Sequence, residues 1–163
     1  MSMETAAQSL RGRGFAVRRF DTGEQAAQYL EQTLHGCTIG FGGSRTAEQL
    51  GLFERLGHSN TVFWHWKQAF DAACTGAAGA RVYITSANAL AETGELVNID
   101  GYGNRVSATA YGPERVIFVI GKNKLAPDLE QAIRRARNVA APLNARRLHK
   151  NTPCAAGPLR CYD

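Results

Sequence analysis

Short apolar segments alternate with segments of helical spacing along most of the chain. The segments with strand features are 14–20, 37–41, 61–66, 81–85, 105–111 and 114–120. The segments with helical features are 24–34, with Asp21 or Thr22 as N-cap, then 46–56 and 67–74. This alternation predicts an α/β domain. The nearly continuous apolar run of 114–120 is typical of a parallel strand that is covered on both faces.

A last helix is predicted from Pro127, because the first helical position tolerates the missing N–H of proline. Its apolar stripe consists of Leu129, Ile133, Ala136 and Ala140. Pro142 should end or kink this helix, and one or two further turns would reach Leu148.

Residues 86–106 form the most distinctive segment. The run combines carboxamides, carboxylates, an arginine and three glycines, and its middle has neither helical nor strand periodicity. It follows the predicted strand 81–85, and open α/β proteins bind ligands in loops that leave the carboxyl ends of strands. A connecting turn needs Gly and Asn but has no need of Glu, Asp and Arg together. We therefore predict a binding site in this run.

Four segments together resemble the signature of the lactate-utilization (LUD) domain family. They are 40–46, 86–106, 121–124 and 137–148, and they occur in the order found in that family, from about residue 15 to 154. The resemblance implies a single-domain member of the ribose-phosphate isomerase and CoA-transferase superfamily. Its expected fold is a three-layer α/β/α arrangement with a mostly parallel central sheet. We expect one domain over 1–150 and a cysteine-containing tail over 151–163.

The glycine-rich loop 40–46 connects a predicted strand to a predicted helix. Glycines let backbone N–H groups approach an anion, and a helix N-terminus adds partial positive charge. The loop is neither a Walker loop nor a full dinucleotide-binding motif, and a capped tight turn would explain it too. In the superfamily that the chain resembles, the corresponding loop holds phosphate or carboxylate groups. We therefore expect an anion site formed by Gly42, Gly43, Ser44 and Thr46.

The catalytic candidates are Glu92 and Asp100. A carboxylate desolvated by neighbouring Ala and Leu residues holds its proton more tightly and could act as a base or nucleophile. The resemblance adds that related enzymes use a glutamate nucleophile or a carboxylate base, and Glu92 follows the predicted strand more closely than Glu95 does. A helix cap or an ion pair with Arg105 would explain Glu92 almost equally well.

Further ligand-binding candidates are hydrogen-bonding side chains, glycines and cations: Asn88, Thr93, Gly94, Asn98, Gly101, Asn104, Arg105, Lys122 and Asn123. A solvated loop lysine explains Lys122 equally well. His65 stands between two tryptophans, which fits a packed strand better than an aromatic lid. No histidine pair has metal-ligand spacing on one helix face, so no metal site is predicted, and no cofactor is identified.

Much of the net charge of +5 lies on the last predicted helix, at Arg134, Arg135, Arg137, Arg146, Arg147 and Lys150. No aromatic residues are interleaved there, so a solvated face is favoured over a nucleic-acid surface, although some arginines could turn toward an anionic ligand.

Cys37 and Cys74 are expected to be buried thiols. No apolar run approaches the length of a membrane span and no secretory signal is found, which favours a cytoplasmic protein.

The resemblance favours a protein of lactate or organic-acid utilization that binds a small anionic metabolite at the carboxyl ends of its central strands. One alternative is a sugar-phosphate isomerase or a CoA-transferase-like enzyme. Another is a non-catalytic subunit of an iron–sulfur lactate oxidoreductase complex, docked through the basic helix and the tail with Cys154 and Cys161. Catalysis itself is left open, and a homo-oligomer is compatible with each hypothesis.

Overall fold

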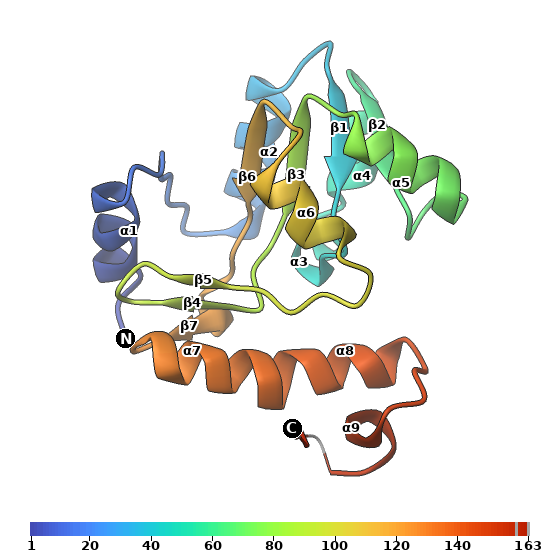
Figure 1. The fold of residues 1–163 in the computed structure, drawn as a ribbon. Coiled ribbons are helices and arrows are strands. Elements are labelled where there is room, and N and C mark those ends of the chain that lie inside the picture. Colours follow the sequence, from blue (N-terminus) through green and yellow to red (C-terminus); the bar gives the residue numbers. More distant parts are fainter. Residues whose placement is uncertain (159, 163) are drawn as a thin grey trace. The chain divides into compact units, whose positions relative to one another are not determined.

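The computed structural model describes residues 1–158 and 160–162, so positions 159 and 163 of the predicted tail lie outside the described residues. The chain forms two compact units, whose elements are labelled in Figure 1. The sheet unit comprises Arg18–Ser86 and Asp100–Ile120. The terminal unit comprises Met1–Val17, Ala87–Ile99 and the described residues from Gly121 onward.

Four parallel strands in the order β2-β1-β3-β6 form the centre of the sheet unit. They are β1 (Thr38–Phe41), β2 (Thr61–Trp64), β3 (Val82–Thr85) and β6 (Arg115–Phe118). Ile39 of β1 is in register with Val62 on one side and Val82 on the other. Because the strands are parallel, their carboxyl ends share one edge, where open α/β sheets bind ligands. The predicted α/β fold with a parallel central sheet is confirmed.

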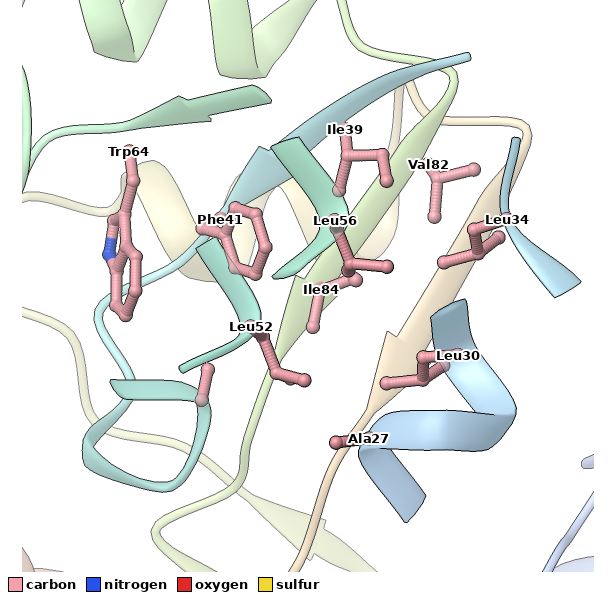
Figure 2. Close-up of a cluster of buried hydrophobic side chains, with 11 residues drawn as sticks. Ala27, Leu30, Leu34, Ile39, Phe41, Leu52, Leu56, Trp64, Val82 and Ile84 are labelled. Carbon is pink, nitrogen blue, oxygen red and sulfur yellow. The ribbon is translucent and has the colours of Figure 1, made fainter. Parts of the chain in front are cut away.

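Helices cover both faces of this sheet (Figure 1). Side chains alternate between the faces, and those of Ile39, Phe41, Trp64, Val82 and Ile84 are buried together on one face, as Figure 2 shows. The helices on that face are α2 (Gly23–Thr33), α3 (Arg45–Gln49) and α4 (Leu52–Gly57).

On the opposite face, Tyr83 packs with Ala77 of α5 (Phe70–Ala78) and Ala108 of α6 (Asn104–Ala110). A Cβ on Gly40 would lie 2.7 Å from the carbonyl oxygen of Ala77, so glycine is required where α5 crosses β1. The sheet unit therefore has three layers, α/β/α, as expected.

Local signals explain several element boundaries. Thr22 and Gln25 form a capping box that begins α2, so the predicted helix and its N-cap are confirmed. The helix predicted over 46–56 is interrupted at Gly51, whose φ of 61° is left-handed, and is divided into α3 and α4. β2 ends at Trp64 rather than at residue 66.

Two of the predicted strands are wrong. Residues 14–20 form no strand, and Phe15 and Phe20 are exposed. The apolar alternation of this segment therefore does not correspond to a face buried in a sheet. Residues 105–111 lie mainly in α6, a helix, because the carboxylate of Asp100 accepts the backbone N–H groups of Arg105 and Val106 at 2.8 and 3.0 Å.

A small sheet in the order β5-β4-β7 forms the centre of the terminal unit. Its strands are β4 (Ala89–Ala91), β5 (Leu96–Val97) and β7 (Leu125–Ala126), and α1 (Met3–Gly12) belongs to the same unit. The antiparallel pair β4 and β5 turns at Gly94, whose φ is 96°. The middle of the polar run 86–106, expected to lack strands, thus contains a hairpin.

The last helix begins after Pro127 rather than at it, with Asp128 as N-cap. It consists of α7 (Leu129–Arg135), the π-helical segment η2 (Ala136–Ala140) and α8 (Ala141–Arg147), which are continuous in Figure 1. The predicted apolar stripe is wrong at Leu129 and Ile133, which are exposed, and right at Ala136, which is buried together with Ala132. Pro142 does not end the helix, and the π-helical turn lies directly before α8, where the proline provides no N–H.

The remaining elements of the terminal unit are short. They are the 3₁₀ turn η1 (Lys122–Lys124) and the helix α9 (Pro153–Ala156).

Candidate functional site

Polar groups of the sheet unit close around Gly42, directly after β1. The backbone N–H of Gly42 donates to the carbonyl oxygen of Ile84 at 3.0 Å, which fixes the loop beside β3. A Cβ on Gly42 would lie 2.7 Å from Thr85 Oγ1 and 3.0 Å from both Arg105 Cγ and the phenol oxygen of Tyr83. Only glycine therefore allows these three side chains to approach the loop backbone.

Arg105 supplies a partly buried positive charge beside this loop. Its Nη1 donates to the carbonyl oxygen of Gly43 at 3.4 Å. Burial lowers the pKa of the guanidinium, and the nearby charge of Asp100 and the phenol of Tyr83 act in the opposite direction. The planar guanidinium makes parallel hydrogen bonds to carboxylates, so this residue suits an anionic ligand.

Two hydroxyl groups lie in this part of the sheet unit with different roles. Burial raises the pKa of Tyr83 well above its usual range, so its phenol stays neutral and can donate or accept a hydrogen bond. The buried hydroxyl of Ser44 accepts the backbone N–H of Ala47 at 3.1 Å and so caps α3. The capped-turn alternative for this loop is therefore realised in the structure, and Thr46 lies half-buried in the first turn of the same helix.

A row of aromatic side chains extends from the same edge of the sheet. Trp66 stacks on Trp64 with ring centroids 5.5 Å apart, and His65 lies edge-on to both Trp66 and Phe70, at 6.2 and 5.6 Å. Phe70 in turn contacts Tyr102 at 5.4 Å. His65 lies beyond the end of β2, so the packed-strand interpretation is wrong. The sequence signals for this row are the Trp-His-Trp run and a tyrosine between two glycines.

The other predicted site residues of the sheet unit lie near the start of α6. Asp100 holds the first turn of that helix, Gly101 is exposed, and Asn104 is its half-buried first residue. The structure thus brings Gly42, Gly43, Thr85, Arg105 and Asp100 together around one strand end.

The remaining predicted site residues lie in the terminal unit. The carboxylate of Glu92, at the end of β4, accepts the backbone N–H of Ser2. Glu95 pairs with Arg13 and accepts the hydroxyl of Thr93. Gly94 forms the hairpin turn between them.

Amide groups form a second cluster in the terminal unit. Asn88 accepts the N–H of Ile99 at 2.8 Å through its Oδ1, and Arg135 donates to the carbonyl oxygens of Asn88 and Asn123. The Oδ1 of Asn98 is buried and has no hydrogen-bond partner among the residues that the structure describes. Lys122 and Asn123 are exposed in η1.

A model of the LUD domain matches residues 3–157, nearly the whole chain. The chain belongs to the LUD domain family. Membership connects it with lactate utilization. No curated protein and no solved structure matches the chain.

Several arginines of the last helix bind other parts of the LUD domain. Arg146 donates to the carbonyl oxygens of Ala155 and Gly157 at 3.1 and 2.8 Å, and Arg137 donates to the thiol of Cys161 at 3.6 Å. Arg134 pairs with Glu130 on the helix surface. Part of the basic composition of this helix therefore holds the C-terminal segment in place.

All four cysteines are free and half-buried, including Cys37 and Cys74, which were expected to be buried. Within residues 1–158 and 160–162, no group of three or more His, Cys, Asp or Glu side chains is arranged to hold a metal ion. Among the helices of the same residues, none combines the length and apolarity that crossing a membrane requires.

Proposed function

We propose that this LUD domain binds a small organic acid of the lactate class at the carboxyl ends of β1 and β3, as part of organic-acid utilization. The observation that supports this most directly is the closure of Thr85, Tyr83 and Arg105 around the side-chain-free backbone of Gly42. Such convergence of a cation and neutral hydroxyls at the carboxyl edge of a parallel sheet is typical of ligand sites.

The carboxylate of the acid is assigned to Arg105. A guanidinium can hold both carboxylate oxygens at once, and partial burial strengthens the interaction because less water screens it. The hydroxyls of Thr85 and Tyr83 are neutral groups suited to the hydroxyl or carbonyl oxygen on the adjacent carbon of the ligand. Asp100 is a positioning residue, because it holds the first turn of the helix that carries Arg105.

In the terminal unit, taken by itself, the family resemblance carries the proposal. Asn88, Asn98 and Lys122 would be its ligand-orienting side chains. Glu92 would be the reacting carboxylate, yet its bond to the N–H of Ser2 supports a structural role equally. Within this unit, the buried Oδ1 of Asn98, which has no hydrogen-bond partner among the described residues, is the group that most favours a ligand contact.

The proposal is tested by titrating the full chain with L-lactate, D-lactate and pyruvate in a calorimeter at neutral pH. We expect saturable binding of at least one of these acids. Arg105→Lys keeps the charge but replaces the planar fork of two donor nitrogens by a single nitrogen, so the Kd should rise by about tenfold to a hundredfold. Arg115→Lys, at the exposed amino-terminal start of β6, is the matched control and should bind like the unaltered chain.

Ribose 5-phosphate and acetyl-CoA, titrated alongside, distinguish the alternative enzyme classes. Binding of either one with no binding of the acids would replace the proposed ligand class by the isomerase or transferase alternative. The proposal is contradicted if none of the acids binds, or if they bind with the same Kd to the Arg105→Lys chain.

A further inference from the structure

The proposed carboxylate site uses none of the aromatic row formed by Trp66, His65, Phe70 and Tyr102. The outer members of this row are open to solvent, since Phe70 is 44% and Tyr102 is 66% exposed. Their rings are tilted by 59° with centroids 5.4 Å apart, a favourable geometry for an aromatic pair. Contiguous exposed apolar surface is one of the features that mark ligand-binding grooves.

The aromatic row begins beside Gly43, whose carbonyl oxygen also accepts a hydrogen bond from Arg105. A Cβ on Gly43 would lie 3.0 Å from Trp66 Cζ2, and the carbonyl oxygen of Gly43 accepts Arg105 Nη1 at 3.4 Å. At the other end, Tyr102 precedes Arg105 by three residues, a separation that spans about 11 Å at most. An acid held by Arg105 therefore has its remaining atoms within reach of the row.

The groups at this edge divide the recognition of such a ligand into two parts. The cation and the hydroxyls select a carboxylate with an adjacent oxygen, as proposed above. The row offers flat apolar surface, on which a ligand ring would gain both burial and a favourable tilted or edge-on geometry. The methyl group, which is all that lactate carries beyond its 2-hydroxy acid group, leaves this surface unused.

We propose, resting on the proposed function, that the preferred ligand is a 2-hydroxy or 2-oxo acid that bears an aromatic ring on its third carbon. Its carboxylate meets Arg105 beside Gly43, and its ring lies on Phe70 and Tyr102. The specificity-determining residues are then the two exposed aromatics, while Trp66 forms the inner wall next to the loop.

The test compares two ligands that differ only in the ring, L-lactate and L-3-phenyllactate, by calorimetry on the full chain. We expect phenyllactate to bind about tenfold to a hundredfold more tightly, because its ring buries apolar area and packs against the aromatic side chains. Phe70→Ala and Tyr102→Ala should each lower this ratio of Kd values severalfold. Tyr111→Ala removes an aromatic ring that is 91% exposed outside the row and should leave the ratio unchanged.

The outcomes separate the two proposals. If neither of these acids binds, and D-lactate and pyruvate do not bind either, the proposed function fails. If lactate binds and phenyllactate binds no more tightly, the proposed function stands and the aromatic preference is wrong. The preference is also overturned if phenyllactate binds more tightly but neither alanine variant lowers the ratio. If Phe70→Ala unfolds, the ratio of Kd values measured for Tyr102→Ala tests the preference, because Tyr102 is more exposed than Phe70 and contributes less to folding.

Discussion

The two ends of the parallel sheet hold their arginines in opposite ways. At the amino-terminal end, Arg81 makes a bidentate bond to Glu114, with Nε 3.1 Å from Oε1 and Nη2 3.0 Å from Oε2. That hydrogen-bonded carboxylate raises the pKa of Arg81. At the carboxyl-terminal end, burial lowers the pKa of Arg105, and the nearby charge of Asp100 opposes this effect.

The two ends also differ in how far water reaches their charges. The amino-terminal end has a cleft of about 350 Å³, lined by residues that include Thr33, His35, Cys37, Arg81 and Glu114. Its paired charges are exposed, so the surrounding water already satisfies them. At the carboxyl-terminal end, Arg105 is partly buried, and burial disfavours the charged form of its guanidinium. Such perturbed groups are typical of functional sites.

The largest effect that sharpens this contrast is expected at Gly42. Gly42→Ala places a methyl group 2.7 Å from Thr85 Oγ1, so the loop, Tyr83 or Arg105 must shift. The free energy of unfolding should fall by about 1–3 kcal/mol, as for overpacked sites, and the affinity for the organic acid should be lost. Urea denaturation measures the first effect and calorimetry the second.

Gly57→Ala is the matched control for this change. Its Cβ would meet Val62 Cγ2 at 3.5 Å, an ordinary contact, and alanine favours the helix in which it lies. Stability should therefore stay the same or rise. If the Gly42→Ala chain kept both its stability and its acid binding, the crowded strand end would carry no function.

The next largest effect is expected when the carboxylates that cap a helix in each unit are removed. Asp100→Ala and Asp128→Ala each remove a carboxylate that accepts backbone N–H groups at the start of a helix, α6 and α7 respectively. Each should lower the free energy of unfolding by about 0.5–2 kcal/mol. Only Asp100→Ala should also weaken acid binding, because only α6 carries Arg105. Equal losses of affinity in the two variants would remove the positioning role of Asp100.

Strand periodicity made the centre of the fold predictable from the sequence. The strands that begin at Thr38, Val82 and Arg115 are short apolar runs, and helices cover both of their faces. Such runs can be recognised in the sequence alone. The helix α6 was not predictable from local pattern, since Val106, Ala108 and Ala110 alternate as in a strand. Its start depends on the carboxylate of Asp100, a contact that periodicity does not contain.

The candidate site was predictable in part for the same reason. Gly42 and Gly43 could be found because glycines between a strand and a helix indicate a close approach of the backbone. Their partners Tyr83 and Thr85 looked like ordinary core residues of a buried strand, and only the parallel register with β1 brings them beside the loop. Glu92 was conspicuous by its position, whereas its bond to Ser2 joins residues far apart in the chain.

A smaller effect concerns the pH dependence of stability at the carboxyl-terminal end. Burial lowers the pKa of His65 below the usual 6.5, and the charge of Asp100 partly opposes this. The unfolded chain therefore binds this proton more readily than the folded chain, so this contribution to stability is full above about pH 6.5 and is lost as the pH falls. Urea denaturation at about pH 7 and pH 5 should show a smaller decline for His65→Gln.

Asp100→Asn provides the converse change, since it removes the opposing charge but keeps an oxygen for the backbone N–H groups of α6. The decline between the two pH values that is due to His65 should then become steeper. An unaltered decline in the His65→Gln chain would assign the acid sensitivity to other groups.

The smallest effect is expected where the comparison began, at the exposed pair. The side chains of Arg81 and Glu114 are 62% and 65% exposed, so water and salt screen their attraction and either partner is readily resolvated when the other is removed. Arg81→Gln should leave the denaturation midpoint nearly unchanged and the affinity for the organic acid untouched. The matching substitution Arg105→Gln should abolish that affinity. If Arg81→Gln lost as much binding as Arg105→Gln, the two ends of the sheet would not differ in function. The exposed, ion-paired Arg81 would then contribute as much to acid binding as the partly buried Arg105.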